Sequence, residues 1–202
     1  MKVEEASPAM GRPRTFDEEE ALEKALRVFW EKGYEGASLS DLTTAMGINR
    51  PSLYAAFGNK EELFQKALAR YDATYMRFVG EALAEPTARA TAERFLAGCA
   101  NLQTNRGDPR GCLGLNGALA CGTAADPIRK VMVARRAEGL AAFRRRFARA
   151  KAEGELPADA SPGDLARYVQ TVSQGMAVQA ASGATRADLH RVVELAMKAW
   201  PG

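Results

Sequence analysis

The sequence predicts an all-α protein, and three observations support this fold class. Apolar residues recur at helical spacing along almost all of the 202 residues. We find no segment with the strict alternation of apolar and polar residues that is typical of a β-strand. Glycine and proline interrupt the pattern at intervals, which divides it into separate helices.

The N-terminal part begins with a polar segment, residues 1–15, that we expect to be disordered. A first helix is predicted from near Asp17, where acidic residues favour a helix N-terminus, to Gly33. Ser38 is the expected N-cap of a second helix, and Asp41 lies three residues later, at the spacing of a capping box.

A tight turn at Gly47 is expected to end the second helix and to lead directly into a third. Asn49 is the predicted N-cap of the third helix, whose inner face carries Leu53 and Phe57. A fourth helix is predicted over residues 59–84. Further helical segments follow at about 87–105, 110–121, 126–152, 162–182 and 186–199.

The composition argues against several classes of function. Cys99, Cys112 and Cys121 form no CxxC pair and the single histidine, His190, is distant in sequence, so we expect no metal site. No phosphate-binding glycine motif and no GxSxG is present, so we expect neither a cofactor nor enzyme activity. No apolar stretch is long enough to span a bilayer and no secretory signal is visible, so we expect a cytoplasmic protein without membrane contact.

The net charge of +3 is mild, but the basic residues are unevenly distributed. Residues 129–151 carry nine Lys and Arg against one acidic residue, Glu138. A basic cluster of this kind suggests nucleic acid as one partner, but a solvated helix face explains it more simply. We therefore interpret this segment as a solvated helix face.

Residues 38–57, two short helices joined by a glycine turn, have the pattern of a helix-turn-helix. The major groove of DNA admits one helix, and a preceding helix at a steep angle braces it. Small outward side chains let such a recognition helix approach the bases, and a Tyr54 hydroxyl reaches a phosphate. The predicted outward residues are Arg50, Ser52, Ala55 and Ala56.

Residues 33–64 read GYEGASLSDLTTAMGINRPSLYAAFGNKEELF, and they resemble the DNA-binding region of the TetR family of transcription regulators. The resemblance extends from Arg12 to Leu63, whereas the rest of the chain carries no motif that names a ligand. The matching positions are Gly33-Tyr34, Ser38, Asp41-Leu42, Ala45, Gly47-Ile48, Leu53-Tyr54, Phe57 and Lys60-Glu61.

The resemblance implies a homodimer that binds double-stranded operator DNA as a repressor and releases it when a small-molecule effector binds. It implies a flexible N-terminal arm (1–14), a three-helix helix-turn-helix domain (15–60) and a larger helical ligand-binding and dimerisation domain (61–202). Residues 1–70 hold ten basic and twelve acidic residues, so binding would depend on a few placed cations and backbone amides. At matching positions, the implied DNA contacts are Ser38, Thr43, Asn49, Arg50, Ser52, Tyr54 and Lys60, with Arg12 and Arg14 in the arm.

The ligand is unknown, but apolar and small residues between positions 86 and 182 are candidates for a cavity between helices. Apolar stripes on the predicted helices 162–182 and 186–199 favour a dimer seam. Two alternatives stay open: a regulator that senses oxidants through a cysteine, and a helical enzyme, for which no nucleophile is paired with a base. The candidate ligand-binding residues are Phe95, Cys99, Leu102, Cys112, Leu113, Asn116, Arg136, Phe143, Tyr168, Val172 and Met176.

Overall fold

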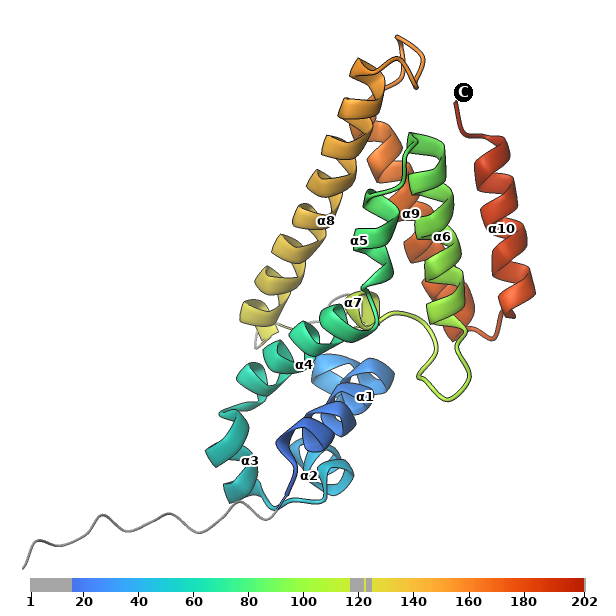
Figure 1. The fold of residues 1–202 in the computed structure, drawn as a ribbon. Helices are drawn as coiled ribbons and strands as arrows, with labels where there is room; N and C mark the ends of the chain where they lie inside the picture. The colour runs from blue at the N-terminus through green and yellow to red at the C-terminus, as the bar shows by residue number, and fades with distance from the viewer. Residues whose placement is uncertain (1–15, 117–121, 123–124, 202) are drawn as a thin grey trace, which may run out of the picture.

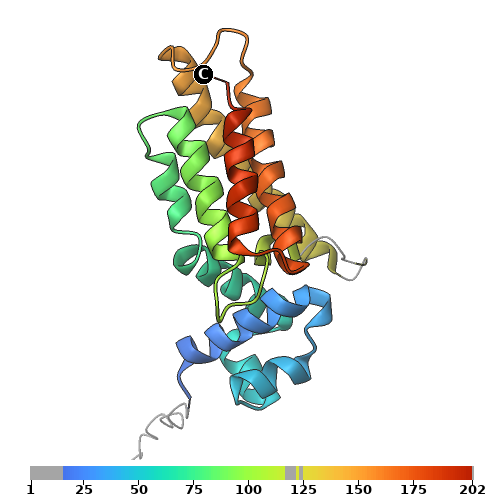
Figure 2. The ribbon, with the colours of Figure 1, turned by 90° about the vertical axis from the view of Figure 1, so that its right-hand side faces the viewer.

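A computed structural model of the chain describes residues 16–116, 122 and 125–201. Every regular element within these ranges is a helix, which confirms the all-α prediction (Figure 1). The N-terminal helices form one end of the molecule and the later helices form a bundle at the other end (Figures 1 and 2). Residues 1–15, including Arg12 and Arg14 of the predicted arm, lie outside the described residues, so the arm stays a prediction.

The N-terminal end consists of four helices whose first turns are capped by side chains. In each case a side-chain oxygen accepts a hydrogen bond from a backbone N–H two or three residues later, which satisfies a donor that the helix itself leaves free. The caps are Asp17, Ser38, Asn49 and Asn59. The helices are α1 (Glu18–Gly36), α2 (Leu39–Met46), α3 (Arg50–Phe57) and α4 (Lys60–Thr74).

One predicted boundary in this region was confirmed and one was wrong. The regular helix is broken at Gly33, as predicted: this residue has the non-helical angles φ 71° and ψ 175°, and a short helical segment then continues to Gly36 at the end of α1. The fourth helix is not continuous to residue 84, because α4 ends at Thr74 and a separate helix, α5 (Phe78–Leu83), follows. No glycine or proline marks this second break, so the sequence pattern gave no stop signal there.

The break after α4 turns the chain into the bundle. Phe78, the first residue of α5, packs with its ring centroid 6.3 Å from that of Phe95 on α6 (Ala88–Gln103). It also covers Gly98, where an added Cβ would lie 2.2 Å from the Phe78 ring. The glycine therefore permits α5 to approach α6 closely.

The bundle is completed by α8 (Asp126–Ala152), α9 (Pro162–Ala181) and α10 (Arg186–Lys198). Figure 2 shows α6, α9 and α10 side by side. The predicted helix over 110–121 was wrong in its first residues, since the short helix α7 spans Leu113–Asn116 and Gly111 has φ 88°; residues 117–121 lie outside the described residues. No helix among the described residues has the length and apolarity to cross a lipid bilayer.

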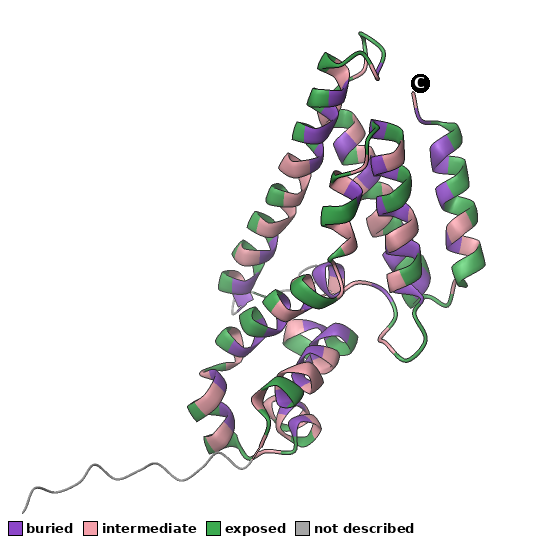
Figure 3. Cartoon of the chain, in the orientation of Figure 1, coloured by how far each residue is buried: buried purple, intermediate pink, exposed green. Residues whose placement is uncertain are grey.

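Two apolar cores hold the molecule together, and the buried stripes of the helices turn towards them (Figure 3). The N-terminal core includes Leu53 and Phe57, which confirms their predicted inward direction. It also takes in Leu113 of α7 and Met132 of α8, so the N-terminal helices pack directly against the start of the bundle. The bundle core includes Phe95, Phe143, Phe147, Met176 and Trp200.

Candidate DNA-binding surface and effector cavity

The turn between α2 and α3 brings the two helices together within three residues. Gly47 adopts the left-handed conformation, with φ 71° and ψ 27°, and the N–H of Ile48 bonds to the carbonyl of Thr43 at 3.1 Å. The Asn49 side chain then accepts a hydrogen bond from the N–H of Ser52 at 2.9 Å and starts α3. This is the geometry of a helix-turn-helix, with α3 in the position of the recognition helix.

Helix α3 has one buried face and one exposed face. Leu53 and Phe57 are buried, whereas Arg50 and Tyr54 are exposed, with Tyr54 at 47%. Ser52 is half-buried between these faces. Helix α3 thus presents the Arg50 guanidinium, the Tyr54 phenol and the Ser52 hydroxyl, and the major groove of DNA admits one α-helix.

The other predicted DNA contacts at the start of α2 and α3 also have structural roles. The Ser38 hydroxyl accepts from the Asp41 N–H, and the Ser38 N–H donates to the Asp41 carboxylate, which forms the predicted capping box. The Thr43 hydroxyl donates to the carbonyl of Leu39 at 2.9 Å. Ser38 and Asn49 remain exposed at helix N-termini, where backbone N–H groups favour an anion such as phosphate.

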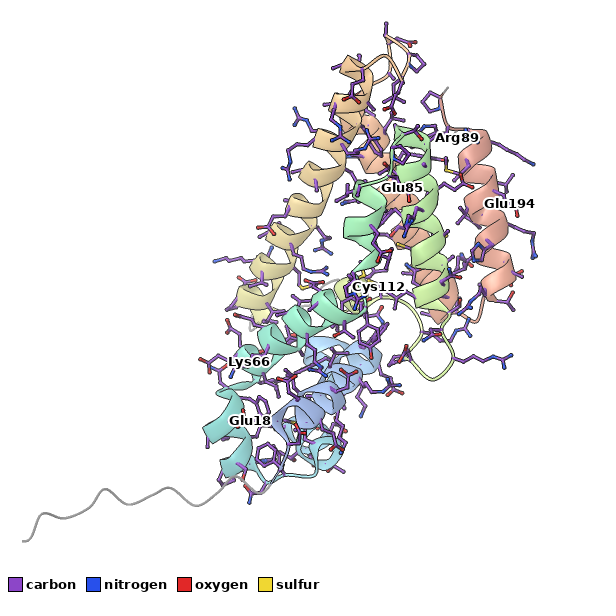
Figure 4. The ribbon with its side chains drawn as sticks, viewed as in Figure 1. Glu18, Lys66, Glu85, Arg89, Cys112 and Glu194 are labelled. Atoms are coloured by element: carbon purple, nitrogen blue, oxygen red, sulfur yellow. The ribbon has the colours of Figure 1, made fainter. Side chains whose placement is uncertain are left out.

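Two lysines on α4 lie beside this surface. The Lys60 ammonium lies 4.6 Å from the centroid of the Tyr34 ring, and burial lowers its pKa although Glu35 and Asp41 oppose that shift. Lys66, which sequence reasoning missed, donates to the carbonyl of Ala56 in the last turn of α3 at 3.3 Å. Lys66 is labelled on α4 in Figure 4. The helical spacing of the sequence gave no signal that its side chain contacts α3.

A second site lies between the N-terminal helices and the bundle. It is a cavity of about 350 Å³, large enough for a small organic molecule. Four of the predicted ligand-binding residues line it: Phe95, Cys112, Arg136 and Phe143. The other residues that line it are Asp72, Met76, Val79, Gln103, Gly114, Leu115, Arg135, Glu138, Gly139, Gln170, Ser173, Gln174 and Ala177.

The remaining predicted ligand residues lie outside the lining, because packing between helices uses their side chains. Val172 and Met176 pack in the bundle core, and the Tyr168 hydroxyl donates to the carbonyl of Ala196 at 3.2 Å. Cys99 is buried, and burial raises the pKa of its thiol to about 12.

Three further predicted ligand residues belong to the N-terminal side of the molecule. Leu102 and Leu113 pack in or against the N-terminal core. The Asn116 amide donates to the carbonyl of Trp30 on α1 at 3.1 Å. Helical spacing identified these residues as inward-facing, but it could not tell which of two cores they enter.

The part of the cavity wall that α8 forms carries charged side chains from the segment that was predicted to be a solvated helix face. Arg135 makes a bidentate ion pair with Asp72 of α4, with Nε 2.9 Å from Oδ2. Burial opposes the charge of this guanidinium, yet the hydrogen bonds and the charge of Asp72 raise its pKa. The basic segment is therefore a solvated face only in part, since Arg146 is also buried.

Cys112 connects the cavity to the N-terminal helices (Figure 4). Its thiol is half-buried, and its sulfur accepts a hydrogen bond from the Tyr71 hydroxyl of α4 at 3.6 Å. A Cβ added to Gly114 would lie 2.8 Å from Arg135 Nη1 and 3.5 Å from this sulfur, so the guanidinium and the thiol flank the same glycine. Among the residues that the structure describes, no cluster of His, Cys, Asp and Glu is suited to a metal ion.

Comparison with known proteins identifies the family. Residues 21–67 match the family described as bacterial regulatory proteins, tetR family, and residues 86–196 match the tetracyclin repressor-like C-terminal domain. The HTH-type transcriptional repressor ComR of Escherichia coli K12 is 32% identical over 196 residues, which cover 95% of this chain and 92% of ComR. The chain therefore belongs to the TetR family.

Solved structures of TetR regulators extend the likeness to the whole fold. A cysteine mutant of the TetR family transcriptional regulator CifR, complexed with 26-base-pair double-strand operator DNA, is 43% identical, with a TM-score of 0.89. The match covers 94% of this chain and 100% of that one. A second CifR cysteine mutant with operator DNA gives a TM-score of 0.90 at the same identity. The chain is thus a transcription regulator of the TetR family, and this confirms the expectation that it is not an enzyme.

Proposed function

We propose that this chain represses transcription by binding operator DNA as a homodimer, and that a small molecule in the cavity releases it. The observation that carries the DNA-binding part is the division of α3, which buries Leu53 and Phe57 and leaves Arg50 and Tyr54 exposed. The likeness to DNA-bound CifR over nearly the full chain supports the same function. The boundary at residue 14 between the arm and the DNA-binding domain, and the boundary at residue 60 between this domain and the C-terminal domain, are part of this proposal.

Each α3 would enter the major groove, with Arg50 and Ser52 next to base edges. Tyr54 and Lys60 would contact phosphates, together with the N-termini of α2 and α3 at Ser38 and Asn49. Thr43 lies on the second turn of α2 and would face the backbone. The arm residues Arg12 and Arg14 would follow the adjacent minor groove.

Fluorescence anisotropy with a duplex from the DNA upstream of the chain's own gene tests this arrangement. Tyr54→Ala or Lys60→Ala should weaken binding on every sequence, and Lys60→Ala should reduce the salt slope by about one unit. Arg50→Ala should lower the preference for the operator over unrelated DNA. Lys130→Ala is the matched control, because this exposed cation lies on α8. Equal losses for Lys130 and Lys60 would contradict the proposed surface.

The cavity has physical links to the DNA-binding helices. Asp72 and Met76, at the end of α4 and just after it, form part of its wall. Cys112 and Leu115 form another part, and the segment that carries them is bonded to α1. An occupant that displaces either wall would change the position of α3 relative to the partner subunit. A dimer must match two DNA half-sites about 34–36 Å apart, so a change in the distance between its two α3 helices would lower its affinity for the operator.

A thermal-shift screen of small molecules followed by operator-release measurements tests the effector hypothesis. Compounds that stabilise the protein should weaken operator binding by about 5–150-fold, which corresponds to an ordinary coupling free energy. Asp72→Asn should change this coupling, since it removes the charge that holds Arg135 to α4. If stabilising compounds never alter DNA affinity, the C-terminal helices serve dimerisation alone.

Oxidation of Cys112 is a second candidate for the releasing signal. Its half-buried sulfur lines the cavity beside Tyr71 and Arg135, whereas the Cys99 thiol is buried and holds its proton. Hydrogen peroxide would transfer one oxygen to the Cys112 thiolate and leave as hydroxide, which converts the thiolate into a sulfenic acid. Peroxide should then lower the operator affinity of the wild type and of Cys99→Ser, but not of Cys112→Ser. Equal loss in all three would exclude Cys112 as the sensor.

A further inference from the structure

Gln103, in the last turn of α6, is a buried amide with one unsatisfied end. The residue is 3% exposed and lines the cavity. Its Nε2 donates to the carbonyl of Ser173 on α9 at 3.1 Å. Its Oε1 has no hydrogen-bond partner among the described residues.

The orientation of this amide is fixed by its surroundings. If the amide were reversed, Oε1 would face the Ser173 carbonyl oxygen, and two acceptors would repel each other. The unsatisfied atom is therefore an acceptor. Buried acceptors without a partner are rare because burial removes the hydrogen bond that water supplies in the unfolded chain. A donor that enters the cavity would satisfy this atom.

The rest of the cavity wall indicates which kind of molecule carries that donor. Phe95 and Phe143 offer an aromatic corner, with ring centroids 4.5 Å apart. The four side chains in the lining that carry a formal charge are two arginines and two acids, so their charges cancel. A wall of this kind suits an occupant with an apolar body and no net charge.

We propose that the cavity recognises a small uncharged alcohol or phenol, whose hydroxyl donates to Gln103 Oε1 while its apolar body packs against Phe95 and Phe143. This assignment rests on the proposed effector function of the same cavity and names the chemical class of the effector. Gln103 is then the residue that determines specificity, because a molecule without a donor leaves its acceptor unpaired.

Isothermal titration calorimetry of the full chain without DNA tests the assignment with three related probes. These are 2-phenylethanol, its methyl ether, which accepts but does not donate a hydrogen bond, and phenylacetate, which adds a negative charge. The alcohol should bind at least about tenfold more tightly than the ether and than the anion. Equal affinity of alcohol and ether, or no binding of the alcohol, would overturn the proposal; equal affinity would mean that water satisfies Gln103.

Two variants locate the preference within the cavity. Gln103→Leu should reduce the ratio of ether to alcohol dissociation constants towards one. Gln174→Leu, the same substitution on a half-buried lining residue that has no buried unpaired amide atom, should keep the ratio. An equal fall in both variants would contradict the role of Gln103. The comparison of the probes on the wild type decides the question even if Gln103→Leu fails to fold.

These titrations and the operator-release measurement fail independently. If the alcohol binds with the expected preference but leaves operator affinity unchanged, the effector function is wrong and the role of Gln103 stands. If compounds release the operator whether or not they carry a hydroxyl donor, the effector function stands and the role of Gln103 is wrong.

Discussion

Gly33→Ala should destabilise the protein strongly, although it adds a single methyl group. Gly33 lies near the end of α1 with φ 71° and ψ 175°, a conformation that is essentially restricted to glycine. An added Cβ would also lie 2.9 Å from the backbone oxygen of Asn116 in α7. Because this oxygen belongs to the main chain, no side-chain rotation relieves the contact.

The magnitude follows from two separable contributions. Backbone strain for a non-glycine residue in this region costs about 1–3 kcal/mol. The contact with Asn116 adds to it, so we expect a loss of about 3 kcal/mol. For a chain of 202 residues this corresponds to a fall of roughly 6–12 °C in Tm.

Two glycines of the same region act as matched controls. Gly47→Ala combines a positive φ with open space around the added Cβ, so it should lose only about 1–2 kcal/mol. Gly36→Ala has neither strain nor a close contact and should stay within about 0.5 kcal/mol of the wild type. Urea unfolding at one fixed protein concentration measures all three, since dimerisation makes stability concentration-dependent. A Gly33→Ala variant as stable as Gly36→Ala would refute the reasoning.

Two further predictions concern pH and assembly. Burial raises the pKa of Cys99 from 9 to about 12, and burial with the Glu23 hydrogen bond raises that of Tyr75 from 10 to about 12. Because the folded chain keeps these protons to a higher pH than the unfolded chain, the free energy of unfolding should fall as pH rises from 9 to 12. In Cys99→Ala this fall should begin nearer pH 10. Urea midpoints that show no fall across this range would contradict the prediction. Leu195, 64% exposed on α10 near the exposed Val192, should lie in the dimer seam, so Leu195→Glu should give monomers in sedimentation while Lys198→Glu does not.

Signals that act over a few residues could be predicted from the sequence. The capping box of Ser38 and Asp41, the left-handed Gly47 and the Asn49 cap each need only three or four neighbouring residues. They fixed α2, the turn and α3, and the positions of Leu53 and Phe57 followed from helical spacing. The break after Thr74 could not be found this way, because it depends on how Phe78 packs against Gly98 on another helix.

The cavity was harder to predict, because it is built from pairs that are distant in sequence. Periodicity placed Phe95 and Phe143 inside, but it gave no reason to join Arg135 to Asp72 or Gln103 to Ser173. A polar residue in an amphipathic helix is expected to face water unless its partner is known. The polar side chains of the cavity wall could therefore be identified only from the three-dimensional structure.

The segment before α7 shows why these distant pairs matter for function. The segment follows an irregular path instead of the predicted helix, and it is bonded to α1: the Trp30 indole donates to the carbonyl of Gly111 at 3.2 Å, and the Asp108 carboxylate pairs with Arg27 at 2.8 Å. The next residue, Cys112, lines the cavity. One short segment is thus bonded to the DNA-binding helices at one residue and exposed to the cavity at the next. A shift of the cavity wall by an occupant would act directly on the carbonyl that holds Trp30.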